Sequence, residues 1–210
     1  MPTDPRSGGT WVGTNDAGLV GCLLNANPPR VPGAPTGGMV RESRGTIIPA
    51  LLASATLADA REMANGIVAH RFPPFRALVL DAESSFVVSS DGVSLRLSGS
   101  KSLRSPVFLA SSGLGDRSVQ LPRRLLFDQF LSDSHDAFDA QRRFHEHRWP
   151  DRPHLSVLMS RADARTVSRT VVDLFADSAV LSHTVLSDRL TGDSPAARIE
   201  LPLLSPQVIA

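Results

Sequence analysis

Residues 10–24 read Thr-Trp-Val-Gly-Thr-Asn-Asp-Ala-Gly-Leu-Val-Gly-Cys-Leu-Leu, and this stretch decides the class of fold. Residues 15–18 form a turn-rich quartet between apolar segments, which predicts a β-hairpin. The return segment, residues 19–24, is almost entirely apolar, and such a run is typical of a strand covered on both faces. We therefore expect the hairpin near the centre of a layered structure rather than at a solvated edge.

Outside the hairpin, the pattern predicts helices that are segregated from strands. Helical spacing of apolar residues, with Thr56 as an N-cap, predicts helices at 43–52 and 56–67, and two more are expected at 122–131 and 135–148. Further strands are expected at 76–80, 85–89, 93–97, 106–110, 155–159, 166–174, 180–186 and 198–203. This order has no regular βαβ alternation, so it predicts an α+β fold with mostly antiparallel strands.

The length of 210 residues fits one domain, and no polar linker divides a self-sufficient core from the rest. We expect a single domain over 1–210, with a disordered or irregular start at 1–9 and a tail at 204–210. Residues 25–38 are rich in proline and glycine, which predicts a long loop.

The composition excludes several classes of function. The chain has 22 Lys and Arg against 21 Asp and Glu, and a net charge of +1 gives no reason to expect a nucleic-acid partner. No apolar run approaches the roughly 18 to 20 residues of a membrane span. Cys22 is the single cysteine, so an internal disulfide is excluded and the cytoplasm is the default location. Arginine supplies every basic side chain except Lys101, which we interpret as a GC-rich bacterial coding bias, with anion binding by arginine as the alternative.

Residues 111–115, Ser-Ser-Gly-Leu-Gly, are a candidate anion site. Two hydroxyls and flexible backbone N–H groups at the end of an expected strand are typical of an anion or oxyanion cradle, with an ordinary turn as the alternative. The segment lacks the Gly-x-Ser-x-Gly pattern of a serine hydrolase. His145 and His147 are two residues apart on an expected helix and point in different directions, so they do not predict a metal site. We expect no metal and no cofactor.

Four parts of the chain, taken together, resemble one family. Residues 8–19 with 23–25 are similar to the Gly-Gly-Thr-Trp hairpin of the NRDE family, also called the transport and Golgi organisation 2 family. Residues 43–45, Ser-Arg-Gly before an apolar helix, resemble the next landmark of that family. Residues 111–115 and 122–127 resemble the middle of the family sequence. Residues 156–159 and 161–168 resemble its C-terminal strand, turn and strand. The segments occur in the family's order, and no single motif carries the resemblance.

This resemblance implies a fold like that of the N-terminal-nucleophile hydrolases, a four-layer αββα sandwich of mostly antiparallel sheets. In that chemistry the first residue of the processed chain is the nucleophile, and its own α-amino group is the base. The family starts with Met-Cys and carries an Asn-Arg-Asp-Glu segment, whereas this chain begins Met-Pro-Thr-Asp. We therefore expect a domain that lacks the family's first strands and its nucleophile, and that is not catalytic.

Two alternatives stay open beside this expectation. In the first, the chain is a truncated or mis-started amide hydrolase whose nucleophile lies upstream. In the second, it binds or moves a small amphipathic ligand such as haem or an acyl compound, as the resemblance suggests. Loss of the first strands would also expose a sheet edge, so a homodimer through that edge is a further expectation.

The matched segments also suggest where a pocket for a small molecule would lie. Trp11 offers an apolar wall with one N–H donor, and side-chain amides of Asn15 and Asn25 can polarise a carbonyl, although turn chemistry is the alternative for Asn15. Arg44 and Arg123 are candidate contacts for an anion, with pairing across helices as the alternative. The candidate pocket residues are Thr10, Trp11, Asn15, Asn25, Ser111 and Ser112.

Overall fold

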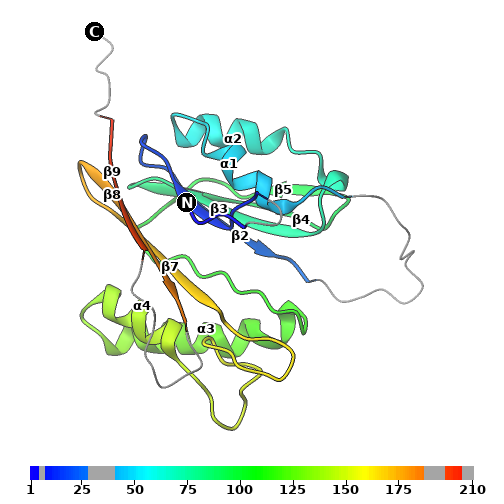
Figure 1. Ribbon diagram of the computed structural model, residues 1–210, viewed down its shortest axis with the longest axis vertical. Coiled ribbons are helices and arrows are strands. Elements are labelled where there is room, and N and C mark those ends of the chain that lie inside the picture. Colours follow the sequence, from blue (N-terminus) through cyan, green and yellow to red (C-terminus); the bar gives the residue numbers. More distant parts are fainter. Residues whose placement is uncertain (5–7, 28–40, 187–196, 205–210) are drawn as a thin grey trace.

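A computed structural model of the chain describes residues 1–4, 8–27, 41–186 and 197–204 (Figure 1). The expected loop at 25–38 and the expected tail at 204–210 lie almost entirely outside these ranges, as does part of the expected irregular start. Antiparallel sheets and separate helices make up the described part, so the predicted α+β class is confirmed. None of the described helices is both long enough and apolar enough to cross a bilayer.

The first sheet is built around the predicted hairpin. Its strands follow the order β1 (Val12–Thr14), β2 (Val20–Asn25), β3 (Phe75–Leu80), β4 (Ser84–Ser90) and β5 (Leu95–Leu97), all antiparallel, and β6 (Lys101–Ser102) also pairs with β4. The hairpin is confirmed, with Val12 opposite Cys22. Its expected central place holds for β2, which pairs on both sides, but β1 ends the row of strands.

Two helices cover one face of this sheet. The short η1 (Arg44–Thr46) leads into α1 (Ile47–Leu51), and α2 (Leu57–Asn65) follows before η2 (Ala69–Arg71) returns the chain to β3. The hydroxyl of Thr56 accepts a hydrogen bond from the Asp59 N–H at 3.1 Å, which confirms the predicted N-cap. Alternate residues of the strands pack against these helices and form the larger core of the molecule.

The second half contains α3 (Asp116–Asp133), α4 (Ala137–Glu146) and a sheet of β7 (Ser168–Leu174), β8 (Ser178–Val185) and β9 (Ala197–Pro202). In Figure 1, α1 and α2 lie on one side of the strands and α3 and α4 on the opposite side. Contact between the sheets involves β1 with β7 and β8. The four-layer sandwich itself stays a prediction.

Two expected strands, 106–110 and 155–159, form no ladder with any other part of the chain that the structure describes. In the second of these, Leu158 donates to the carbonyl of His147, and Met159 donates to the hydroxyl of Thr166 at 2.9 Å. The backbone groups are therefore satisfied by a loop and by a side chain. Helix α3 also begins six positions earlier than expected, directly after Gly115 at φ 99°, and holds Pro122 inside it.

The first two family-like segments meet at two glycines. A Cβ atom on Gly9 would lie 2.6 Å from the Cα atom of Gly45, a distance that side chains do not adopt. The backbones approach this closely because Thr10 donates its N–H to the carbonyl of Gly45 at 3.0 Å. The glycine in each segment is therefore explained by the contact with the other.

Candidate functional site

A cavity of about 370 Å³ lies between the end of β2, the segment before α3, α3 itself and the loop before β7. It contains three of the six candidate pocket residues and one of the two candidate anion contacts, and we name it the Ser111 cavity. Its lining is Asn25, Asn27, Ser111, Ser112, Gly113, Arg123, Val157, Met159, Arg161, Ala164 and Thr166. The volume is within the usual range of small-molecule sites.

The carboxylate of Asp116, at the start of α3, positions one wall of the Ser111 cavity. It accepts hydrogen bonds from the backbone N–H groups of Asn27 at 3.1 Å and Ser112 at 3.0 Å. Arg76 on β3 donates to the same carboxylate at 2.6 Å, so its charge is neutralised by an ion pair. The side-chain amide of Asn27 in turn donates to the hydroxyl of Ser111 at 3.2 Å. Three distant segments are thereby fixed around two serines.

Arg123 on α3 lines the Ser111 cavity and is 9% exposed. Its guanidinium donates to three backbone carbonyls, those of Leu155 at 2.9 Å, Ser156 at 2.7 Å and Ser111 at 3.3 Å. The described residues give it no carboxylate partner. Burial lowers the pKa of the Arg123 guanidinium from its ordinary value, because desolvation disfavours the charged form. The carbonyls therefore hold a positive charge that is not neutralised locally.

Two further polar groups at this cavity are buried without a hydrogen-bond partner among the described residues. They are the side-chain amide of Asn25, through its Oδ1 atom, and the guanidinium of Arg161, through its Nε and Nη1 atoms. The opposite edge of the Arg161 guanidinium faces the carboxylate of Asp163, with Nε 3.1 Å from Oδ1. An unsatisfied buried donor costs free energy, so Nη1 is a polar atom of this wall that the described residues leave without compensation.

The other predicted site residues lie outside the Ser111 cavity and tie the first hairpin to its neighbours. The amide of Asn15 donates to the carbonyls of Leu52 at 2.9 Å and Ser54 at 2.8 Å. Its Oδ1 atom accepts from the Leu19 N–H at 2.9 Å, which is the turn chemistry given above as the alternative. Thr10 is buried, and its hydroxyl contacts the carbonyl of Val12 at 2.9 Å.

Trp11 and Arg44 contact each other. The Trp11 side chain is largely exposed, and the Arg44 guanidinium lies 6.0 Å from the centre of its ring. Arg44 also donates to the carbonyl of Pro74 at 2.9 Å. Through these contacts, Arg44 connects the residue before β1 with the segment before β3. Neither Trp11 nor Arg44 lines the cavity that contains Ser111 and Ser112.

The family model described as Transport and Golgi organisation 2 matches residues 2–144, more than half of the chain. The chain belongs to the transport and Golgi organisation 2 family. No curated protein matches the chain significantly in sequence. For this family member, the match includes the first sheet, α3 and most of α4, and thus Asn25, Ser111, Ser112 and Arg123 of the cavity. Arg161 and Thr166 follow the matched range.

Sequence reasoning missed three residues that shape the Ser111 cavity of this transport and Golgi organisation 2 family member. Asn27 and Asp116 act through long-range hydrogen bonds, and Arg161 lies in a loop. The start of a helix at Asp116 could have been predicted, because an acidic residue directly after a glycine is typical of the first turn of a helix. The position of Arg161 depends on the packing of the loop and has no comparable local signal.

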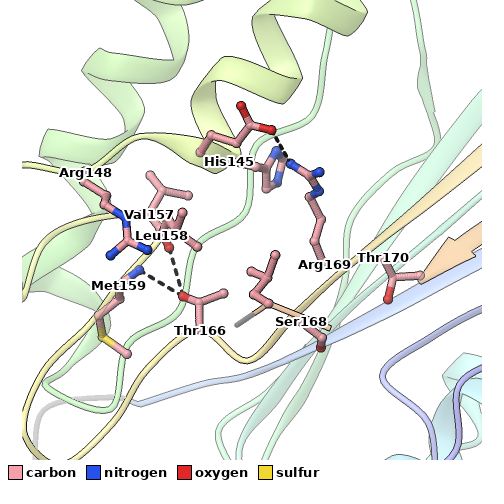
Figure 2. Close-up of a pocket in the computed structure, with 11 residues that line it drawn as sticks. His145, Arg148, Val157, Leu158, Met159, Thr166, Ser168, Arg169 and Thr170 are labelled. Atoms are coloured by element: carbon pink, nitrogen blue, oxygen red, sulfur yellow. Dashed lines mark hydrogen bonds and ion pairs between the residues drawn. The ribbon is translucent and has the colours of Figure 1, made fainter. Parts of the chain in front are cut away.

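A second cavity of about 300 Å³ lies between α4 and β7 (Figure 2). It shares the wall formed by Val157, Met159 and Thr166 with the Ser111 cavity. We name it the α4–β7 cavity. The rest of its lining is His145, Glu146, Arg148, Leu158, Ser168, Arg169, Thr170 and Leu186.

The charges of the α4–β7 cavity are partly paired. Arg169 binds Glu146 at 2.7 Å, which leaves this pair neutral. His145 contacts the carbonyl of Gln141 through Nδ1 at 2.8 Å, and desolvation lowers the pKa of His145, so it is neutral at pH 7. The described part of the chain contains no cluster of His, Cys, Asp and Glu that could hold a metal ion.

Cys22 lies on β2, where a small part of the residue reaches solvent but its thiol is buried. Desolvation raises the pKa of Cys22 to about 11, against a hydrogen bond with the backbone of Leu78 that acts in the opposite direction. The thiol is therefore protonated at neutral pH and is a poor nucleophile.

Proposed function

We propose that this chain is a non-catalytic protein that binds a small molecule through a carboxylate or phosphate group in the Ser111 cavity. The observation that carries the proposal is the buried guanidinium of Arg123, which has three carbonyl partners and no carboxylate partner among the described residues. Buried charges in proteins are normally paired, so an anion from outside is the partner that this arrangement lacks.

The remaining groups of the cavity support the same proposal. The free Nη1 donor of Arg161 can form a charge-assisted hydrogen bond with an anion, and such bonds are about twice as strong as neutral ones. The hydroxyls of Ser111 and Ser112 are on the same lining and can donate to oxygen. One acidic residue, Asp163, faces Arg161 from outside the lining.

The absence of a base in the described lining argues against catalysis at these serines. A serine nucleophile needs an adjacent histidine, lysine or free carboxylate to take its proton. The described lining contains none of these, and the nearby Asp116 is paired with Arg76. The Ser111 hydroxyl instead accepts a hydrogen bond from Asn27, which does not activate it.

Titration of the purified chain with inorganic phosphate and with acetate, followed by calorimetry, tests the proposal. We expect saturable binding of at least one of them, and Arg161→Gln should weaken it about tenfold because it removes a charged donor. Arg71→Gln is the matched control, since Arg71 pairs with Glu42 on an exposed surface. A wild-type chain that binds neither anion saturably would overturn the proposal, as would equal binding by the Arg161 variant.

A further inference from the structure

The two cavities are adjoining compartments, because three residues belong to the lining of both. Val157 and Met159 supply apolar surface to this shared wall, and Thr166 supplies a hydroxyl. That hydroxyl is already occupied, since it accepts from the Met159 N–H at 2.9 Å and contacts the Val157 carbonyl at 3.3 Å. The middle of the combined space is therefore suited to an apolar group.

Each cavity is lined by an arginine that no described carboxylate neutralises. Arg123 lines the Ser111 cavity together with Arg161, which forms an ion pair with Asp163, and Arg148 lines the α4–β7 cavity. Arg148 forms no ion pair with a described carboxylate, in contrast to Arg169, which binds Glu146. Figure 2 shows the Arg148 guanidinium directed toward the segment that contains Leu158 and Met159. An exposed arginine that is not held by a carboxylate can bind a second anionic group.

We infer that the ligand is a single elongated molecule with an anionic group at each end and a short apolar segment between them. The first anion binds Arg161 beside Arg123, the apolar segment lies on Val157 and Met159, and the second anion binds Arg148. This inference rests on the proposed function, since it assigns the second half of the same ligand. The chemical class is that of linear molecules with two carboxylates or phosphates.

Calorimetric titration with linear dicarboxylates of increasing chain length, each beside the monocarboxylate of equal length, tests this inference. At the matching length, we expect the dicarboxylate to bind at least about tenfold more tightly, because the second contact is then intramolecular. Arg148→Gln should reduce this ratio to about one while leaving the monocarboxylate affinity unchanged. Arg148→Lys, which keeps the charge, should retain part of the preference, and Arg71→Gln should retain all of it.

The outcomes separate the inference from the proposed function. Equal affinity for mono- and dicarboxylates at every length would overturn the inference, and so would a length preference that Arg148→Gln leaves intact. In both cases the proposed function stands if Arg161→Gln still weakens monocarboxylate binding. If no carboxylate and no phosphate bind saturably, both fail. Thermal melting of each variant shows whether it is folded, and Arg148 is exposed, so its replacement leaves the core unchanged.

Discussion

Two regions of the molecule differ in how they are packed. One is the first sheet with α1 and α2, and the other is the second half with α3, α4 and β7–β9. The core of the first half joins fifteen buried residues, most of them on β2, β3, β4, α1 and α2. Several of them, such as Phe75 and Ile48, have no exposed surface. The cluster of contacting apolar residues between α3 and α4 contains only three buried members, Leu126, Phe127 and Phe144, and partly buried residues surround them. Both cavities lie largely in this second half. The more densely packed core thus lies in the first half of the chain, and the cavities lie largely in the second half.

Phe75→Ala should have the largest effect on stability. Phe75 is 0% exposed and packs edge-on against Phe72, so its removal leaves a cavity in the densest part of the molecule. We expect the free energy of unfolding to fall by about 3 to 5 kcal/mol in urea denaturation. Phe138→Ala is the control, because Phe138 is 72% exposed, and it should change stability by less than about 0.5 kcal/mol.

Phe144→Ala tests the second core in the same way and should cost less, about 2 to 3 kcal/mol. Phe144 contacts Phe108 and Phe127, and the partly buried Phe108 has room to move into the space. The measurement is again urea denaturation. A loss equal to that of Phe75→Ala would contradict the difference in packing described here.

The hairpin and the caps could be predicted from the sequence because their signals are local. The turn at 15–18 and the Thr56 cap each involve partners a few residues apart. The Ser111 cavity could be predicted only in part, through Asn25, Ser111, Ser112 and Arg123. The expected strands at 106–110 and 155–159 failed because periodicity does not tell whether a neighbouring strand exists to pair with. Asp116 and Arg161 acquire their roles from tertiary packing alone.

The dependence of stability on alkaline pH tests the burial of the Cys22 thiol on β2. Below about pH 9, Cys22 is protonated in both states; above it, the unfolded thiol ionises while the folded one, with a pKa of about 11, does not. The free energy of unfolding should therefore fall by about 2 kcal/mol between pH 9 and 11. The chain has no tyrosine and only Lys101 as lysine, so few other groups titrate there. Urea denaturation of wild type and Cys22→Ala checks this, and parallel curves would exclude Cys22 as the cause.

Asp116→Asn should have the smallest effect on stability, about 1 kcal/mol, because its ion pair with Arg76 is partly exposed. Its effect on the cavity should be larger. Hydrogen exchange at the amides of Asn27 and Ser112 should accelerate, while amides of β3 and β4 stay protected. Asp128→Asn, which removes an exposed pair with Arg124, is the control. Uniform acceleration over the first sheet would show that Asp116 supports the whole fold and not the wall alone.

The order in which the molecule assembles follows from Asp116. Its hydrogen bonds span 89 residues to Asn27 and 40 residues to Arg76. Closing loops of this length costs chain entropy, whereas the β1–β2 hairpin closes locally. Strands β2 and β3 must already be paired before one carboxylate can find both partners together. We therefore expect this wall of the Ser111 cavity to form late in folding, after β2 and β3 have paired.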